Sequence, residues 1–324
     1  MKAKSEIRRV LGRCRSVLLI SHVNPDGDTV GAALGLAWAL RSRGAVATLS
    51  CADPLPPALR FLPGADAYAA RALSDEDCVI AVDAADVARL GSVYDAARDG
   101  RVPLVVIDHH VTNRGYGDVN LVEERSSTAE LVLELLDTLG IPLDQTIATC
   151  LMTGLVTDTQ GFRTSNTSAR SFAAAGRLIS AGADLEEINR AAFKQRTVGS
   201  LAVWGQALSG ARFEEGIVWA AVSREMLARN GQRDDTVSGL VNFLATVDEA
   251  RIAAVFHQVD EEHVEVGLRS VPGVNVAAVA ARFGGGGHAQ ASGFTATGLL
   301  PEVIEQVLPA LRAAVNGGEP GTHG

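Results

Sequence analysis

Short apolar runs alternate with helix-length segments along the first half of the chain. β-Branched and other apolar residues fill four such runs, at 16–21, 45–50, 78–83 and 103–110. Runs that are apolar at almost every position are typical of parallel strands buried on both faces, and the segments between them supply the helical crossovers. The pattern therefore predicts an α/β fold whose first domain holds a doubly wound, mainly parallel sheet.

Two of the predicted helices are marked by the residues at their ends. The amphipathic run from Thr29 to about Arg43 is expected to end at Gly44, because glycine readily adopts the left-handed conformation that terminates helices. Ser127 and Glu130 have the spacing of a capping box at the start of a later helix. We expect both helices to cover a face of the predicted sheet.

The pattern changes between residues 190 and 212, where one continuous helical period predicts a connector. Beyond it, two alternating runs at 251–259 and 263–270 flank an acidic turn and predict a β-hairpin. A smaller α/β domain with a mixed sheet accounts for this half of the chain. We therefore expect a first domain at 1–190, a helical connector at 191–212, a second domain at 213–315 and a disordered tail at 316–324.

Composition and charge narrow the range of functions. The 324 residues are 47% hydrophobic and 21% charged, which describes a globular chain and excludes general disorder. The formal net charge of −9 disfavours binding to long duplex nucleic acid, because such binding relies on a basic surface. A small polyanion can still bind an acidic protein where metal ions or a few arginines supply positive charge.

The cysteines and the apolar runs indicate in which cellular compartment the protein is found. The four cysteines lie far apart and form no CxxC pair, which is typical of a protein in a reducing environment. The apolar run after the basic N-terminal segment is too short for a signal peptide, and no run approaches the roughly 18 residues of a membrane span. We expect a cytoplasmic protein without a membrane partner.

Polar side chains follow three of the predicted strands at the point where each strand ends. A single polar strand end is explained by a turn or a helix cap, since both favour aspartate and asparagine. Caps do not account for three histidines, and the carboxyl ends of parallel strands line one crevice where ligands bind. The residues expected to meet there are His22, Asp26 and Asp28 after the first strand, Asp83 after the third, Asp108, His109 and His110 after the fourth, and Asp158 at the end of a later helix.

These residue types favour a divalent metal centre. Carboxylate oxygens and imidazoles together suit Mn²⁺, Fe²⁺, Co²⁺ or Zn²⁺. Four aspartates in one pocket repel one another unless cations lie among them. Two ions about 3.5–4 Å apart, sharing one carboxylate, would use the whole set.

Five stretches of the sequence resemble the motifs of the DHH phosphoesterase superfamily. HVNPDGD, AVDAAD, IDHH and TDTQGFR occur in the order of the four motifs of that superfamily. VAAVAARFGGGGHAQASGF is similar to the glycine-rich signature of its DHHA-type C-terminal domain. The resemblance extends over roughly residues 5 to 315, and the closest pattern is that of the branch of nanoRNases and pAp phosphatases.

The resemblance implies which side chains bind metal. Each of two ions would take one histidine and two or three aspartates, with one aspartate bridging. The first set is His22, Asp26 and Asp83, and the second is Asp28, Asp83, His109 and Asp158. Mn²⁺ is the metal expected first, with Mg²⁺, Co²⁺ and Fe²⁺ as alternatives.

Three further residues bear on the substrate. The resemblance implies that His110 is a catalytic residue that contacts the substrate and that Asp108 supports it. Gln160 stands where many relatives have glycine. It adjoins Asp158 without replacing a ligand, so this departure concerns the fit of the substrate more than the metal.

A glycine run near the C-terminus is the expected substrate-binding element. Consecutive glycines allow the backbone to approach a phosphate closely, and their N–H groups can form an anion nest. A flexible linker is the alternative reading of the run. Arg269 ends a predicted strand and would clamp a phosphate, unless it is simply an exposed strand-end arginine. The candidate substrate-binding residues are Gly285, Gly286, Gly287, His288 and Arg269.

The resemblance implies a metal-dependent phosphoesterase with its active site in a cleft between the domains. Such an enzyme hydrolyses very short 5′-phosphorylated oligoribonucleotides to mononucleotides, and 3′-phosphoadenosine 5′-phosphate (pAp) to AMP, with a hydroxide that two metal ions activate. A homodimer formed through the first domain is also implied. The alternatives are a soluble phosphodiesterase acting on cyclic di-AMP or pApA, and a catalytically inactive nucleotide sensor, which is disfavoured because no metal ligand is missing.

Overall fold

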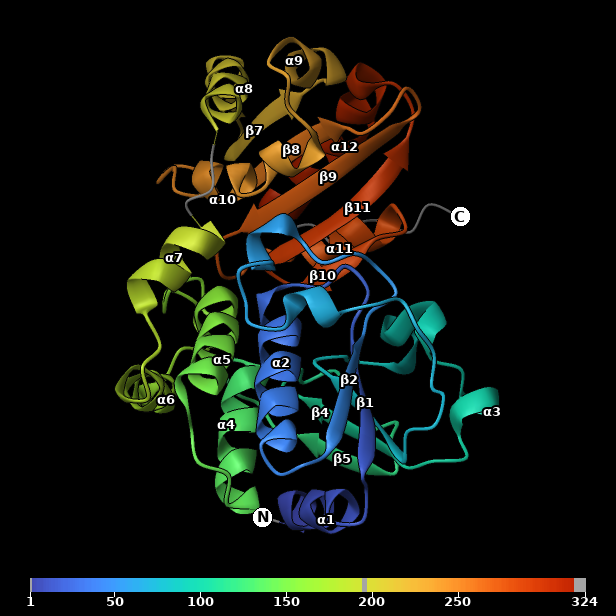
Figure 1. Cartoon of the computed structure of the whole chain (residues 1–324). Coiled ribbons are helices and arrows are strands. Elements are labelled where there is room, and N and C mark those ends of the chain that lie inside the picture. The colour runs from blue at the N-terminus through green and yellow to red at the C-terminus, as the bar shows by residue number, and fades with distance from the viewer. Residues whose placement is uncertain (1, 194–196, 318–324) are drawn as a thin grey trace. The chain divides into compact units, whose positions relative to one another are not determined.

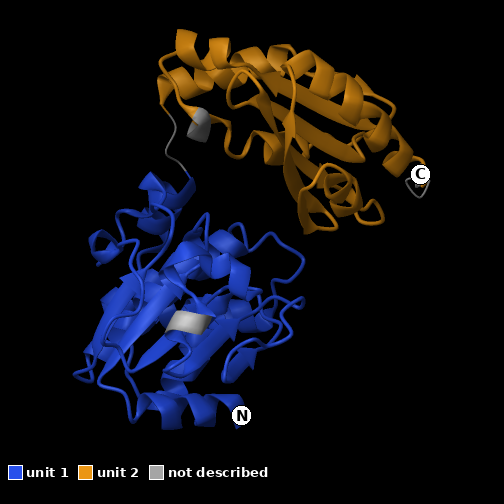
Figure 2. Ribbon diagram, turned by 90° about the vertical axis from the view of Figure 1, so that its right-hand side faces the viewer, with its two compact units in different colours: residues 1–195 blue, residues 196–324 orange. Residues whose placement is uncertain are grey.

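The computed structural model describes residues 2–193 and 197–317 of the chain. The chain divides into unit 1, residues 1–195, and unit 2, residues 196–324 (Figure 2). Each unit has its own sheet and its own buried apolar core. The division lies within the segment expected to connect the domains.

Unit 1 is built on a five-stranded sheet with the order β2-β1-β3-β4-β5, in which every neighbouring pair is parallel (Figure 1). The strands are β1 (Ser16–Ser21), β2 (Val46–Ser50), β3 (Cys78–Val82), β4 (Leu104–Asp108) and β5 (Val119–Val122). The first four coincide with the predicted apolar runs. The edge strand β5 was missed because it has only 4 residues and buries only alternate ones.

Helices cover one face of this sheet, and short helical turns cover the other. The helices are α1 (Lys2–Leu11), α2 (Gly27–Arg41), α4 (Thr128–Leu139), α5 (Gln145–Asp158), α6 (Ala169–Ser180) and α7 (Leu185–Phe193). α1, α2 and α4 contact the strands, α5 packs on α2 and α4, and α6 and α7 pack on α5. On the opposite face, Leu90 and Val93 pack against the sheet. The crossover between β3 and β4, expected to be a regular helix, is instead the 3₁₀ segment η3 (Val87–Val93), broken at Gly91, and the short α3 (Ala96–Asp99).

Glycines bring α2 and α5 into close contact. A Cβ atom added to Gly31 of α2 would lie 2.4 Å from the Cys150 carbonyl oxygen of α5, so only glycine fits there. This approach carries Asp28, near the start of α2, and Asp158, at the end of α5, to the same edge of the sheet.

The predicted capping box of α4 is only half formed. Ser127 Oγ accepts a hydrogen bond from the backbone N–H of Glu130 at 3.2 Å, as expected for an N-cap. The Glu130 carboxylate instead accepts a hydrogen bond from Ser126 Oγ at 2.7 Å. The reciprocal half of the box was therefore wrong, because a neighbouring hydroxyl competes for the carboxylate.

Unit 2 holds a six-stranded mixed sheet with the order β10-β11-β9-β8-β7-β6. Only β7 and β8 are parallel, and the predicted hairpin is the antiparallel pair β8–β9. The strands are β6 (Arg212–Glu214), β7 (Ile217–Val222), β8 (Ile252–Gln258), β9 (His263–Ser270), β10 (Gly286–His288) and β11 (Ala291–Thr297).

Helices of unit 2 lie on both faces of its sheet (Figure 1). One core forms between the sheet and the pair α11 (Val276–Arg282) and α12 (Leu300–Val315). The other forms beneath α8 (Val198–Ser209), α9 (Arg224–Arg229), η4 (Asp234–Val237) and α10 (Leu240–Leu244).

The predicted connector at 191–212 is not one helix. α7 ends at Phe193, residues 194–196 lie outside the described residues, and α8 begins after its own N-cap, Thr197. Of the predicted tail at 316–324, residues 318–324 also lie outside the described part. Within the described ranges, we find no helix with the length and apolar character needed to cross a membrane.

Candidate metal centre

The polar strand ends of unit 1 do converge. The connection that follows β1 leads to β2 on one side, and the connection that follows β3 leads to β4 on the other. The carboxyl ends of β1 and β3 therefore form a topological switch point, where ligands bind in such sheets. His22 directly follows β1, Asp83 directly follows β3, and His109 directly follows β4. Asp158 reaches the same place as the last residue of α5.

The first predicted metal set is assembled in the structure. His22 Nε2 lies 3.6 Å from Asp26 Oδ2 and 3.5 Å from Asp83 Oδ2. His22 Nδ1 lies 2.8 Å from the carbonyl oxygen of Val23, so the ring can donate there and turn the Nε2 lone pair toward the carboxylates. One ligand atom from each of the three residues lies within 4.8 Å of the others.

The second predicted set gathers around His109. Its Nε2 lies 3.6 Å from Asp83 Oδ1 and 3.6 Å from Asp158 Oδ2. Its Nδ1 lies 3.1 Å from the carbonyl oxygen of Arg125, which orients this ring as Val23 orients His22. Ligand atoms of Asp28, His109 and Asp158 also lie within 4.8 Å of one another, and Asp83 lies between the two sets.

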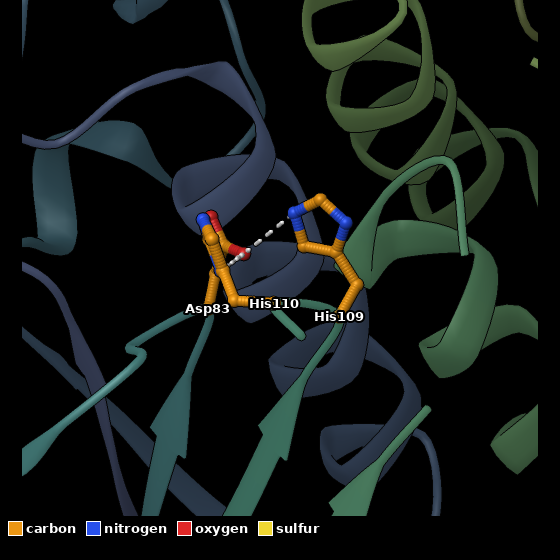
Figure 3. A group of neighbouring side chains, drawn as sticks. All are labelled: Asp83, His109 and His110. Atoms are coloured by element: carbon orange, nitrogen blue, oxygen red, sulfur yellow. Dashed lines mark ion pairs between the residues drawn. The ribbon is translucent and has the colours of Figure 1, made fainter. Parts of the chain in front are cut away.

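His110 lies beside these sets and has a carboxylate partner of its own. Asp83, His109 and His110 come together beyond the tips of neighbouring strands (Figure 3), and their ligand atoms would also fit a metal ion. His110 Nδ1, however, is 2.8 Å from Asp108 Oδ1 and 3.7 Å from Asp83 Oδ1. The shorter contact indicates that this nitrogen donates to Asp108, whose other oxygen accepts from Asn113 Nδ2 at 2.7 Å.

The electrostatics of the centre fit divalent cations. Burial, together with the carboxylates of Asp83 and Asp158, raises the pKa of Asp28 well above its usual value. Burial raises the pKa of Asp158 to about 6. Burial alone would lower the pKa of His22, but hydrogen bonds with Asp26 and Asp83 raise it to about 10. The carboxylates outnumber the cationic groups that offset them, and their oxygens with two imidazoles form a donor set that suits Mn²⁺ and similar ions.

Thr128 links both metal sets and was missed from the sequence. Its backbone N–H donates to Asp28 Oδ2 at 2.6 Å, and the N–H of Ala129 donates to Asp28 Oδ1 at 3.0 Å. Its Oγ1 donates to Asp83 Oδ1 at 2.7 Å. The first turn of α4 therefore fixes two predicted ligands. No local pattern signals this role, because Thr128 lies 45 residues from Asp83 in the sequence.

Asp83 itself has an unusual backbone. Its φ of 61° lies in the left-handed region, which residues other than glycine rarely adopt. Its N–H donates to the carbonyl oxygen of Ile107 at 2.9 Å, so the conformation is held by the neighbouring strand β4. The strained turn directs the side chain toward both histidines and is the kind of feature found at functional sites.

In unit 2, the glycine run is neither a linker nor an open anion nest. The N–H groups of Gly284 and Gly285 already donate to carbonyl oxygens of α11, and Gly286–His288 form the edge strand β10. A Cβ on Gly285 would lie 2.2 Å from the carbonyl oxygen of Gly293. Part of the run is therefore glycine because β11 packs against it.

Arg269 and His288 lie on one face of the sheet of unit 2. Arg269 of β9 pairs with Ala291 of β11, and Ala291 pairs with His288 of β10. Side chains directly opposite one another point to the same face, so a small alanine separates the two candidate substrate-binding side chains. Arg269 is half-buried, and burial lowers its pKa.

An adjacent row of this face consists of glycines. Gly267, Gly293 and Gly286 pair across β9, β11 and β10. A Cβ on Gly286 would meet nothing within 4 Å, and its φ lies outside the left-handed region. The fold gives no steric reason for glycine at this position, in contrast with Gly285.

Comparisons with known proteins assign each of the two units to a known domain family. Residues 16–155 match the N-terminal domain of the DHH family, and residues 217–317 match the DHHA1 domain. A protein of Thermus thermophilus named "Bifunctional oligoribonuclease and PAP phosphatase NrnA" is 36% identical over 302 residues, covering 91% of this chain and 89% of that protein.

More distant relatives agree with this assignment. A protein of Geobacillus thermodenitrificans named "Cyclic-di-AMP phosphodiesterase GdpP" is 28% identical, and the match covers 97% of this chain but 50% of that protein. The crystal structure of an exopolyphosphatase-related protein from Bacteroides fragilis matches with a TM-score of 0.90 and 24% identity, covering 97% of this chain and 98% of the other. The last comparison supports the fold alone.

Replacing Thr128 by valine should weaken metal binding without unfolding the protein. Valine keeps the shape but removes the hydroxyl that orients Asp83. We expect the Kd for Mn²⁺, measured by titration calorimetry, to rise by about tenfold, and Thr128→Ser to restore it. The control is Thr153→Val, because Thr153 is also buried and helical but donates within α5, to Thr149. Equal weakening by both valine variants would contradict this role.

Replacing Asp158 by asparagine should weaken metal binding without lowering the stability of the metal-free protein. Because folding raises the pKa of Asp158, the folded state holds this proton more tightly than the unfolded chain, and metal-free stability falls as the pH rises from about 4 through about 6. At neutral pH we expect metal-free Asp158→Asn to melt at or above the wild-type temperature and to gain less from Mn²⁺. Thermal melts with and without Mn²⁺ at several pH values test this. A lower melting temperature without metal would show that the carboxylate is stabilising instead.

Proposed function

The chain belongs to the DHH family, and on that premise we propose that it is a phosphoesterase that hydrolyses very short 5′-phosphorylated oligoribonucleotides to mononucleotides and pAp to AMP. The observation that carries this proposal is the similarity to the Thermus relative along both units. The convergence of the predicted ligands in unit 1 supports it independently. Both substrates present a phosphate joined to the 3′ oxygen of a nucleotide.

We assign the two metal sets to two divalent ions, with Mn²⁺ as the preferred one. His22, Asp26 and Asp83 would hold the first ion, and Asp28, Asp83, His109 and Asp158 the second. Such ions supply Lewis-acid chemistry that activates water and neutralises phosphate charge. The contribution of the chain is to fix the donors: Val23 and Arg125 orient the imidazoles, and Thr128 orients the shared carboxylate.

His110 is assigned to the substrate. Burial alone would lower its pKa, but the hydrogen bond with Asp108 raises it, which favours the protonated ring. Asp108 is in turn fixed by Asn113, which also donates to the carbonyl oxygen of Ala84 at 3.1 Å. We assign His110 the role of hydrogen-bond donor to an oxygen of the reacting phosphate, and Asp108 that of its positioning partner.

In unit 2, the row of Arg269 and His288 is assigned to the nucleotide that does not react. A guanidinium and an imidazole can both donate to phosphate oxygens. The adjacent glycines leave room for the rest of the nucleotide on the same face. The row would then determine which substrates bind well, while the residues of unit 1 perform the chemistry.

We also propose a homodimer and a cytoplasmic location. The dimer is implied by resemblance, and α6 of unit 1 supplies apolar surface for it, since Phe172 and Ile179 are 59% and 47% exposed. The four cysteines support the cytoplasmic location, because none forms a disulfide, as expected in a reducing compartment.

Initial rates on a panel of substrates test the activity. With Mn²⁺, we expect pApA and pAp to be hydrolysed at least about tenfold faster than cyclic di-AMP and a pentanucleotide RNA, and Asp83→Ala to lose more than nine-tenths of the rate because both metal sets share this carboxylate. Faster hydrolysis of cyclic di-AMP would favour the phosphodiesterase alternative, which the Geobacillus relative keeps open. A folded protein that turns over none of the four would contradict the proposed function and favour the alternative of a nucleotide sensor.

A substitution at Gly286 tests the role of unit 2. Because a side chain there meets open space, Gly286→Val should fold normally and lower kcat/KM for pApA by about tenfold or more. Hydrolysis of bis-p-nitrophenyl phosphate, which lacks a second nucleotide, should hardly change. The control is Gly205→Val, an equally open position in α8. Loss of both activities would place the glycine run in the catalytic machinery, and loss of neither would remove it from the substrate site.

A further inference from the structure

Arg89 brings an unassigned guanidinium to the first metal set. It belongs to η3, which follows β3 and Asp83, and its side chain is half-buried. Its Nη2 lies 3.0 Å from His22 Nδ1, on the side of the ring away from Asp26 and Asp83. A positive side chain therefore lies one imidazole ring away from the predicted metal ligands.

The backbone around Arg89 is held in place from two sides. Asp86 caps η3, and its Oδ1 accepts from the N–H of Arg89 at 3.2 Å. The carbonyl oxygen of Arg89 accepts from the N–H of Val23 at 2.8 Å, next to His22. Gly91, with a φ of 62°, permits this approach, because a Cβ there would lie 2.6 Å from Val23 Cγ1. The segment is built to hold Arg89 against the His22 loop.

The contact with His22 does not satisfy the guanidinium. His22 Nδ1 also lies 2.8 Å from the carbonyl oxygen of Val23, to which it can only donate. A guanidinium has donors and no acceptor, so the same nitrogen cannot accept from Arg89 while it donates to Val23. When His22 directs its Nε2 lone pair toward a metal ion, Nδ1 carries the hydrogen, and His22 offers no acceptor to the N–H donors of Arg89.

No carboxylate supplies that acceptor. Among the described residues, no aspartate or glutamate oxygen lies within 4.0 Å of the Arg89 guanidinium, although the surroundings are rich in aspartate. Arg125, near the second metal set, is different, because it forms ion pairs with Glu123 and Glu134. An arginine held at a phosphoester site without an anionic partner is suited to bind phosphate, since its planar fork matches two phosphate oxygens.

From this geometry, and resting on the proposed function, we propose that Arg89 binds an oxygen of the phosphate that is hydrolysed and stabilises the charge that develops on it. Arg89 would then be a catalytic residue next to the first metal set. Arg269 and His288, in contrast, are assigned to the part of the substrate that does not react. Lysine would keep the charge but lose the paired donors.

The test measures turnover and metal binding in the same variants. Arg89→Ala and the size-conserving Arg89→Gln should lower kcat by about 10²–10³-fold on both pApA and bis-p-nitrophenyl phosphate, and Arg89→Lys should lie between them and the wild type. The Kd for Mn²⁺, from titration calorimetry, should change less than about threefold, because His22 keeps its bond to Val23. Arg60→Ala, at an exposed arginine of unit 1, is the control and should behave as wild type.

Three other results would overturn the proposal. A rise in the Mn²⁺ Kd parallel to the loss of rate would show that Arg89 only supports His22. A loss confined to pApA would place Arg89 on a remote phosphate, and unchanged rates would remove it from the site. If the wild type hydrolyses bis-p-nitrophenyl phosphate but neither pApA nor pAp, the proposed function fails, whereas the variants still decide the role of Arg89 on the small ester.

Discussion

Repulsion among buried carboxylates is the constraint on which the architecture of unit 1 depends. Asp28, Asp83 and Asp158 come from three different elements and are brought together at one edge of the sheet. Two imidazoles, the N–H groups at the start of α4 and the hydroxyl of Thr128 offset part of this charge. The remainder calls for cations. Without cations the arrangement is unfavourable. The close packing of α2 on α5, the strained backbone of Asp83 and the short 3₁₀ crossover η3 hold it in place.

The convergence of the candidate ligands could be predicted from the sequence, because each stands at the end of an element that has a local signal. Asp83 and His109 directly follow apolar strands, and parallel strands align their carboxyl ends. The residues that contact these side chains from distant parts of the chain could not be predicted. Thr128 and Arg89 contact Asp83 and His22 across 45 and 67 positions, and nothing in their own neighbourhoods distinguishes them from ordinary helix residues.

The glycine run shows a second limit of the sequence. Four consecutive glycines suggest mobility or a nest of N–H groups, yet the run contains an edge strand whose register with β11 decides the role of each position. Gly285 is required by the backbone of Gly293, whereas Gly286 faces open space. Two adjacent and chemically identical residues thus differ in the steric constraint on them, and only pairing with β11 distinguishes them.

The hydrogen bonds from α4 to Asp28 have a consequence for the order of folding. They join positions 100 and 101 residues apart, so the first turn of α4 gains these acceptors only after a long loop has closed. Contacts of such separation are costly to form early in folding. We therefore expect the candidate metal centre to form late in the folding of the unit rather than to nucleate it. Metal ions would act on the finished protein by mass action, drawing the population toward the native state rather than guiding the chain to it.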